Sequence, residues 1–259
     1  MCYDDTARPP APEGQAGETS HEDVELTSAD GNRFAAYMAR SASPAGAQVL
    51  IYPDVRGLHG FYRALADRFA EQGIDALAID YFGRTAGQAP RDDAFEFMPH
   101  VQQMIFPQFI SDVTAALDYL QHGERAGRPT FVVGFCMGGT LTLLTGTQQF
   151  KLAGLIPFYS GFSRKFEGYG RTALEAAQEI HYPLLGLYGG ADQGIPVEQV
   201  NELDARLDKA NVEHTIVIYP GAPHSFFDRK ATDFAEASAD SWKRILAFIS
   251  AHSHSSTPS

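Results

Sequence analysis

Short apolar runs alternate along this chain with longer segments in which apolar residues recur every three or four positions. The runs predict strands and the periodic segments predict helices. Because strands and helices take turns, the pattern predicts a mostly parallel sheet with helices on both faces. Predicted strands cover 49–52, 76–79, 130–133, 155–158, 184–188 and 215–219; predicted helices cover 61–72, 111–121, 138–146 and 197–210, with a last helix from about 231.

Three parts of the pattern depart from simple alternation. Two β-like runs, at 24–26 and 33–38, flank a turn signal at 30–32 and predict an antiparallel hairpin ahead of the parallel strands. Two connections, 84–110 and 160–182, are longer than neighbouring elements require. Ligands of such sheets bind beyond the carboxyl ends of the strands, so we expect both long connections to overhang a site there.

Length and composition fit one globular domain. The chain has 259 residues, of which 44% are hydrophobic, enough for one large core. Residues 1–20 are rich in Pro, Gly, Glu and Ser and predict a disordered leader, and 253–259 predict a flexible tail, which leaves a single domain over 21–252. The start of the chain lacks the features of a signal peptide, and no stretch approaches the ~20 apolar residues of a membrane span. We therefore expect a cytoplasmic protein without a membrane partner.

The net charge of the chain limits the partners that it is expected to bind, and its cysteine content bears on whether disulfides are expected. The chain has 32 acidic and 20 basic residues and a formal net charge of −12, which repels phosphate backbones, so nucleic acid is not an expected partner. A few arginines in a pocket can still bind a small anion, because distant charge is screened beyond ~10 Å. The two cysteines are Cys2, in the predicted leader, and Cys136, so no disulfide framework is expected.

Cys136 stands at a sharp corner of the predicted fold. The run TFVVGFCMGG places it after an apolar strand and before a helix, between Gly134 and Gly138. A sharp strand-to-helix turn needs glycines, and a turn of this kind, the nucleophile elbow, projects its central side chain outward. The helix N-terminus stabilises negative charge by ~0.3 to 1 kcal/mol and so favours a thiolate. Taken alone, the same residues fit a small buried cysteine in a tight turn equally well.

Two polar residues follow later strands in the order that an elbow nucleophile requires. Asp192 follows the strand at 184–188 in the sequence GGADQGIP, and His224 follows the strand at 215–219 in PGAPHSFF. Asp192 alone would also fit a helix cap, and His224 alone a loop histidine. Because both are expected at the carboxyl edge of the sheet, in the order nucleophile, acid, histidine, we interpret Cys136, Asp192 and His224 as a catalytic triad.

Spacing argues against other cysteine and cofactor chemistries. A phosphatase loop needs an arginine six residues after the cysteine, where this chain has Thr142. A redox dithiol needs a second cysteine at position 139, which is glycine. A P-loop ending and the usual zinc-ligand spacings are absent as well. We therefore expect neither a metal nor another cofactor.

Four motifs of the chain resemble the dienelactone hydrolase family of α/β-hydrolases, over roughly residues 24–250. They are YPDVRGLHGFYRALADRFAEQGIDALAIDYFGR, GFCMGG, GGADQGIP and PGAPHSFF. The resemblance implies an α/β-hydrolase fold and an ester or lactone hydrolase that forms a thioester on Cys136. It also implies an oxyanion hole from the backbone N–H groups of Met137 and Val55.

The same resemblance implies an acidic catalytic side chain beside the thiol, and the matching residue is Asp54. The family usually has glutamate at this place, which is one methylene longer. A direct contact between Asp54 and Cys136 is therefore in question, and a water or a pairing with Arg56 would replace it. The alternative interpretation of Asp54 is a turn residue.

Two arginines hold the substrate carboxylate in dienelactone hydrolases. The first matches Arg84, while the second falls on Asp228, one place before Arg229. That departure puts the dienelactone itself in question and leaves an ester or lactone, including an anionic one, as the expected small-molecule partner. We expect the substrate to contact Arg84, Arg229, Arg56 and Phe135.

Two other functions stay open at this point. A module of the same fold without catalysis could bind a small molecule or a partner protein, although the intact triad residues argue against it. A cysteine peptidase could use the same three residues, but it would need an extended groove for a peptide, of which the sequence gives no sign. The sequence predicts no oligomeric state.

Overall fold

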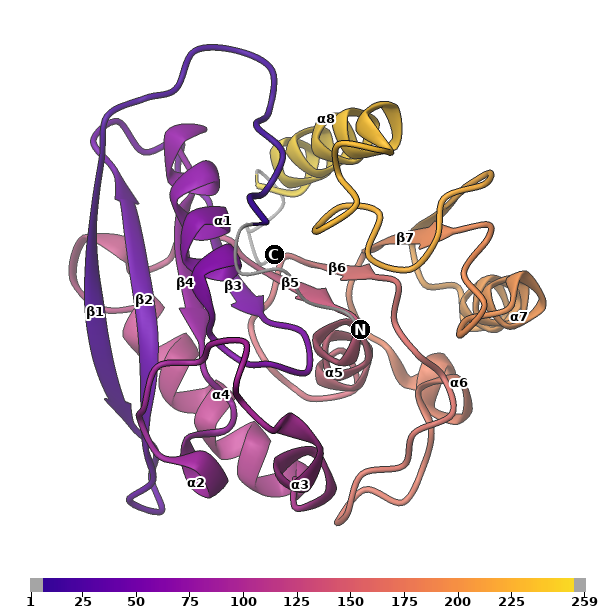
Figure 1. Ribbon diagram of the computed structural model, residues 1–259, viewed down its shortest axis with the longest axis horizontal. Coiled ribbons are helices and arrows are strands. Elements are labelled where there is room, and N and C mark those ends of the chain that lie inside the picture. The colour runs from indigo at the N-terminus through magenta and orange to yellow at the C-terminus, as the bar shows by residue number, and fades with distance from the viewer. Residues whose placement is uncertain (1–6, 254–259) are drawn as a thin grey trace.

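A single eight-stranded sheet forms the centre of the protein, for which the computed structural model describes residues 7–253 (Figure 1). The strands lie in the order β1-β2-β4-β3-β5-β6-β7-β8. β2 pairs antiparallel with β1 and β4, and the other neighbours pair parallel, which confirms the predicted mostly parallel sheet with an antiparallel hairpin. The bounds are β1 (Thr19–Thr27), β2 (Arg33–Ser41), β3 (Gln48–Tyr52), β4 (Asp75–Ile79), β5 (Thr130–Phe135), β6 (Gly154–Phe158), β7 (Leu184–Gly189) and β8 (His214–Tyr219).

Helices cover both faces of the sheet, as predicted. α1 (Gly60–Glu71) and α8 (Ala235–His252) share one face and touch through Phe69 and Trp242, whose ring centroids are 4.9 Å apart. α4 (Phe106–Leu120) and α5 (Met137–Thr145) lie on the opposite face, and Figure 1 shows the two pairs above and below the central strands. The remaining helices are α2 (Gly83–Ala86), α3 (Phe97–Gln102), α6 (Ala173–Ala176) and α7 (Val197–Lys209), with short 3-10 helices at Gly123–Arg125 and Ala177–Glu179.

The central strands carry apolar side chains on both faces because both faces are covered. Every residue of β3, β4, β5, β6 and β7 is buried. Such strands read as continuous apolar runs rather than as an alternation, which is why the sequence revealed them. Across residues 7–253, no helix combines the length and the apolar character needed to cross a membrane.

Residues 7–18 form no helix or strand, yet they pack against the face that carries α1 and α8. The indole N–H of Trp242 donates to the carbonyl of Pro10 at 2.8 Å, and the backbone N–H of Gly17 donates to Glu71 at 2.9 Å. Pro9 and Pro12 are buried. Prolines have little conformational entropy to lose, so few contacts hold such a segment. This part of the chain differs from the predicted disordered leader; residues 1–6 of that leader and 254–259 of the predicted tail lie outside the described residues.

Two helices begin four or more residues away from their predicted starts. α4 begins at Phe106 rather than near 111, since Pro107 stands in its first turn, where proline is favourable. α8 begins at Ala235 rather than near 231, because turns occupy 225–234 and Ser225 has a φ of 60°. The turns at 225–234 follow His224 directly, and two of their residues, Arg229 and Lys230, line the pocket described below.

Candidate active site

Cys136 occupies the corner that the sequence predicts, between β5 and α5. It is the N-cap of α5, with φ 55° and ψ −114°. Its backbone N–H donates to the carbonyl of Phe158 in β6 at 3.1 Å, and its own carbonyl accepts from Thr140 at 3.1 Å. Such backbone angles are unfavourable for a residue with a side chain, and strain of this kind occurs at functional sites, where the surrounding structure maintains it.

The two glycines beside Cys136 are required by close packing. A Cβ atom on Gly134 would lie 2.2 Å from the carbonyl oxygen of Gly138, and one on Gly138 would lie 2.2 Å from the carbonyl oxygen of Pro53. No side chain fits at either position. The close approach at Gly138 also brings the chain after β3, which leads to Val55, next to the start of the helix that carries Met137.

A pocket of about 590 Å³ opens at the carboxyl edge of the sheet and brings the three predicted triad residues together. Cys136 follows β5, Asp192 follows β7 and His224 follows β8, and all three line this pocket. Val55 and Met137 line it as well. Parallel strands place the residues that follow them at one edge, which explains why distant parts of the chain meet here.

The imidazole of His224 is fixed by Asp192. His224 Nδ1 lies 2.6 Å from Asp192 Oδ2, and the backbone N–H of Gly194 donates to Asp192 Oδ1 at 2.8 Å. The Asp192 side chain is only 2% exposed, whereas that of His224 is 26% exposed. A short hydrogen bond to a buried carboxylate holds both the orientation and the tautomer of the imidazole, and leaves its Nε2 atom available to the pocket.

The contacts of His224 raise the pKa of its imidazole. Burial alone would lower its pKa, but the hydrogen bond with Asp192 and the interaction with the Cys136 side chain outweigh burial and raise the pKa to about 10. His224 therefore carries a proton at neutral pH. A thiolate formed at Cys136 would face this positive charge.

Cationic side chains line part of the pocket, although the whole chain is strongly acidic. Arg164, Arg229 and Lys230 belong to the lining, and Asp192 is the one acidic residue among the lining residues. Because Asp192 is engaged with His224, the open wall of the pocket is positively charged. Of these cations the sequence indicated Arg229 alone, since neither Arg164 nor Lys230 belongs to a recognisable motif.

Only one of the two long connections overhangs the pocket. Gly161, Ser163 and Arg164, from the connection 160–182, line it, as predicted. The expectation for the connection 84–110 is wrong, because none of its residues belongs to the lining. That segment forms α2, α3 and the start of α4 and buries aromatic side chains such as Phe106 in the core.

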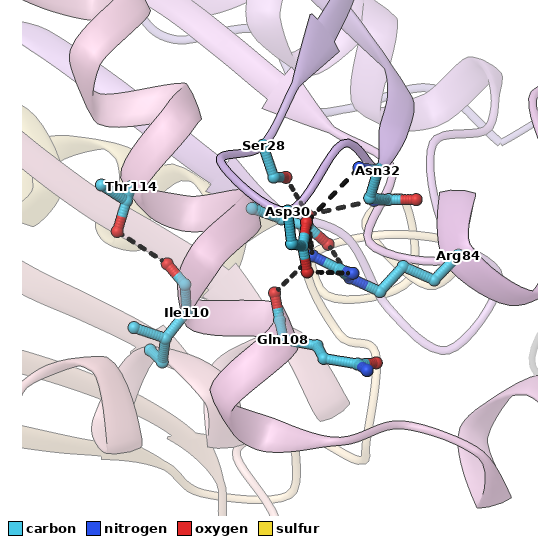
Figure 2. A network of polar contacts seen from close by, with 8 residues as sticks. Ser28, Asp30, Asn32, Arg84, Gln108, Ile110 and Thr114 are labelled. Atoms are coloured by element: carbon cyan, nitrogen blue, oxygen red, sulfur yellow. Dashed lines mark hydrogen bonds and ion pairs between the residues drawn. The ribbon is translucent and has the colours of Figure 1, made fainter.

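Arg84 lies away from the pocket, and the predicted substrate contact is wrong for it. Its guanidinium pairs with Asp30 at 2.7 Å and with Asp112 at 2.8 Å, and it donates to the backbone carbonyl of Gln108 at 3.1 Å (Figure 2). The hydroxyl of Ser28 also donates to Asp112. Arg84 thus ties the turn of the β1–β2 hairpin to α4.

Two further predicted substrate contacts are wrong for this pocket. Arg56 is 3% exposed and pairs with Asp93 at 3.2 Å, and Phe135 is fully buried with its ring 4.6 Å from that of Phe158. Neither residue lines the pocket. Phe135 is next to the cysteine in sequence, but it is the last residue of β5 and packs in the core, whereas Cys136 begins the turn into α5.

Asp54 is buried in the turn that follows β3. Its carboxylate accepts a hydrogen bond from the backbone N–H of Arg56 at 2.8 Å and lies 3.6 Å from His59 Nε2 and 3.9 Å from Arg56 Nε. These contacts fit the turn interpretation and the pairing with Arg56, and they shape the loop that presents Val55. Asp54 is not among the lining residues, and its predicted contact with the thiol stays a prediction.

The described residues bring one group of possible metal ligands together that the sequence spacing did not indicate. Asp204, Asp208 and His214 have ligand atoms within 4.8 Å of one another. His214 is the first residue of β8, so the group lies at the edge of the sheet opposite the pocket. His214 Nε2 lies 3.1 Å from Asp204 Oδ1, an ordinary hydrogen-bond distance. This group therefore has no part in the chemistry of the pocket.

A mostly parallel sheet with a cysteine-bearing elbow after a central strand, and with an acid and a histidine after later strands, defines the α/β-hydrolase class. Residues 34–253 match the family model described as "Dienelactone hydrolase family". A Salmonella typhimurium protein provisionally named carboxymethylenebutenolidase is 30% identical over 234 residues, which cover 85% of this chain and 83% of that protein. The chain belongs to the dienelactone hydrolase family and is a hydrolase.

Solved structures agree with this assignment. A crystal structure of a provisionally assigned dienelactone hydrolase from Klebsiella pneumoniae has a TM-score of 0.78 and 26% identity, over 90% of this chain and 99% of that chain. The acylaminoacyl peptidase of Pyrococcus horikoshii has a TM-score of 0.75 over 94% of this chain and 43% of that chain, at 15% identity. The second likeness concerns the fold alone.

Proposed function

We propose that this protein hydrolyses an ester or a lactone through a thioester on Cys136, with His224 transferring protons and Asp192 orienting the imidazole. The observation that carries the proposal is the meeting of these three side chains in one pocket, with 2.6 Å between His224 Nδ1 and Asp192 Oδ2. Membership of the dienelactone hydrolase family supports it. The name of the Salmonella relative points in the same direction, since a butenolide is a lactone.

The first step forms the acyl-enzyme. The thiolate of Cys136 attacks the carbonyl carbon, a carbon–sulfur bond forms, and the carbonyl π electrons move to oxygen. The backbone N–H groups of Met137 and Val55 would donate to this oxyanion, and each such donor is worth on the order of 10²- to 10³-fold in rate. The carbon–oxygen bond to the alcohol then breaks, and the alcohol takes the proton of the His224 imidazolium.

The second step regenerates the enzyme. His224, now neutral, accepts a proton from a water molecule at Nε2, and the resulting hydroxide attacks the thioester carbonyl. The carbon–sulfur bond breaks, the acid product leaves, and Cys136 is again a thiolate beside a protonated His224. Asp192 accepts the Nδ1–H bond throughout and balances the positive charge of the imidazole.

The nature of the nucleophile and the wall of the pocket narrow the substrate class. A thiolate leaves a tetrahedral intermediate more readily than an alkoxide does, so esters with good leaving groups and enol lactones should react, whereas amides should return to starting material. The positive charges of Arg164, Arg229 and Lys230 favour a substrate that carries a carboxylate. The dienelactone itself is not required by either argument.

A substrate panel tests the proposed activity. We expect turnover of an activated ester and of an enol lactone, and no turnover of a peptide of matched size. Peptide hydrolysis at a similar kcat/KM would favour the cysteine peptidase instead. Absence of all turnover, together with no labelling of Cys136 by an ester-mimicking electrophile, would favour a non-catalytic binding module.

Replacing Arg164 by alanine should separate anionic from neutral substrates. We expect KM for a carboxylate-bearing ester to rise about tenfold, because one charge-assisted contact is worth ~1.5 kcal/mol, and KM for the matched neutral ester to change little. Steady-state kinetics on the two esters provide the measurement. Arg171→Ala is the matched control, since Arg171 lies in the same connection but pairs with Glu179 and is not a lining residue. Equal losses on both esters would refute a carboxylate-binding role.

A further inference from the structure

Tyr159 lies beside His224 but is not part of the pocket lining. It follows β6 directly, is fully buried and has a φ of 32°, a value that a bulky residue rarely adopts. Its backbone N–H donates to the carbonyl of Leu187 in β7 at 2.8 Å, which helps to hold this conformation. A strained residue next to a reactive histidine is a candidate for a functional role.

The side chain of Tyr159 joins two titratable groups. Its ring centroid lies 4.8 Å from that of the His224 imidazole, and its hydroxyl donates to Asp228 Oδ2 at 3.1 Å. Asp228 is 8% exposed, and its Oδ1 atom accepts from the backbone N–H of Arg229. Each carboxylate oxygen of Asp228 thus has its own donor, and one of those donors is attached to the ring that packs on His224.

The surroundings of Asp228 raise the pKa of its carboxyl group. Burial is the largest cause and the negative charge of Asp54, from the loop after β3, is the next; together they raise the pKa of Asp228 to about 6. Tyr62, from α1, also faces this region, and its buried hydroxyl has no hydrogen-bond partner within residues 7–253. With Tyr159 and Arg229, these are the titratable and charged groups that face Asp228. Its protonation state therefore changes within the range in which a hydrolase is assayed.

We propose that Asp228 and Tyr159 are positioning residues for His224, and that protonation of Asp228 loosens the imidazole. An ionised carboxylate accepts both hydrogen bonds, whereas a protonated carboxyl carries a donor on one oxygen, so the bond with the Tyr159 hydroxyl reverses or the bond from the Arg229 N–H weakens. Either change reaches the site, because Tyr159 packs on His224 and Arg229 lines the pocket. This inference rests on the proposed function and adds a pH-dependent control of the same site.

Two substitutions and one control test the positioning role. Asp228→Asn imitates the protonated carboxyl, since an amide nitrogen cannot accept a hydrogen bond, and Tyr159→Phe keeps the ring but removes the donor. Tyr188→Phe is the control: Tyr188 is as deeply buried, its hydroxyl lies 2.6 Å from Ser160 Oγ, and it is not a lining residue. The measurements are kcat and KM for a neutral activated ester between pH 4.5 and 8.5, and the rate at which iodoacetamide alkylates Cys136 over the same range in a Cys2→Ser background.

In the unmodified protein, kcat should fall as the pH decreases through about 6, the value to which the pKa of Asp228 is raised. This fall is the acid limb of the pH profile. Asp228→Asn should lack this limb and have a kcat lower by about tenfold at pH 7.5, with a smaller change in KM. Tyr159→Phe should move the limb to higher pH, because the hydrogen bond from Tyr159 lowers the pKa of Asp228. Tyr188→Phe should leave the limb in place.

The inference would be overturned if the acid limb lay at the same pH in the unmodified protein, in Tyr159→Phe and in Asp228→Asn. Residues with a merely structural role would not change the pH at which kcat falls. The alkylation profile requires no turnover, so it tests the positioning role even where the proposed hydrolysis fails. Turnover that survives Cys136→Ala would contradict the proposed function instead. If Tyr159→Phe does not fold by its melting curve, the presence or absence of the limb in Asp228→Asn decides.

Discussion

Replacing Cys136 by alanine is expected to lower kcat for an activated ester by about 10⁴-fold or more, because the described residues that line the pocket include no second thiol to form the thioester. The fold should survive. The side chain of Cys136 makes no capping hydrogen bond to α5, and alanine meets the same backbone strain as cysteine at a φ of 55°. Initial rates, together with thermal melting of both proteins, provide the measurement.

The controls for this substitution separate the nucleophile from the pocket. Cys136→Ser keeps the shape of the side chain and should retain a small fraction of the activity, since serine is the usual nucleophile of such an elbow. Removal of the other cysteine, by Cys2→Ala, should leave kcat unchanged. If the Cys136→Ala protein hydrolyses the ester at the rate of the unmodified protein, Cys136 is not the nucleophile.

Replacing Asp192 by asparagine is expected to lower kcat by about 10² to 10⁴-fold, because the amide no longer fixes the tautomer or balances the charge of His224. The hydrogen bond that His224 donates to Asp192 helps to raise the pKa of His224 to about 10, so its loss lowers that pKa. The imidazole then loses its proton at lower pH. We expect the alkaline limb of the pH profile of kcat/KM to move to lower pH in the variant.

Asp204→Asn is the matched control for Asp192→Asn. Asp204 also pairs with a histidine, His214, at 3.1 Å, but on the surface of α7 and at the opposite edge of the sheet. The control should leave both kcat and the pH profile unchanged. An Asp192→Asn protein with the kcat and the alkaline limb of the unmodified protein would show that the His224–Asp192 bond has no catalytic role.

The sequence predicts those parts of the molecule that depend on local constraints. The buried strands are recognisable because coverage on both faces makes them continuous apolar runs, with polar residues only at strand starts such as Gln48, Asp75 and Thr130. The elbow is recognisable because Gly134 and Gly138 admit no Cβ atom. Asp192 and His224 could be located because parallel strands deliver the residues that follow them to one edge.

The wall of the pocket is not predictable in the same way, because it depends on contacts between distant parts of the chain. Arg84 matches a family position in the sequence, but its partners Asp30 and Asp112 are 54 and 28 residues away. Arg164 and Lys230 reach the pocket through a long connection and an irregular turn, for which no periodic pattern exists. The strain at Tyr159 is also invisible in sequence, since it arises where β6 and β7 meet.

Thioester formation at Cys136 is tested most directly by mass spectrometry of the protein stopped within milliseconds of mixing with a slowly hydrolysed activated ester. We expect one added acyl group, located on the peptide that contains Cys136, released by hydroxylamine and missing from the Cys136→Ala protein. An acyl group on any other residue, or product release with no acyl group on Cys136 at any time, would contradict the mechanism.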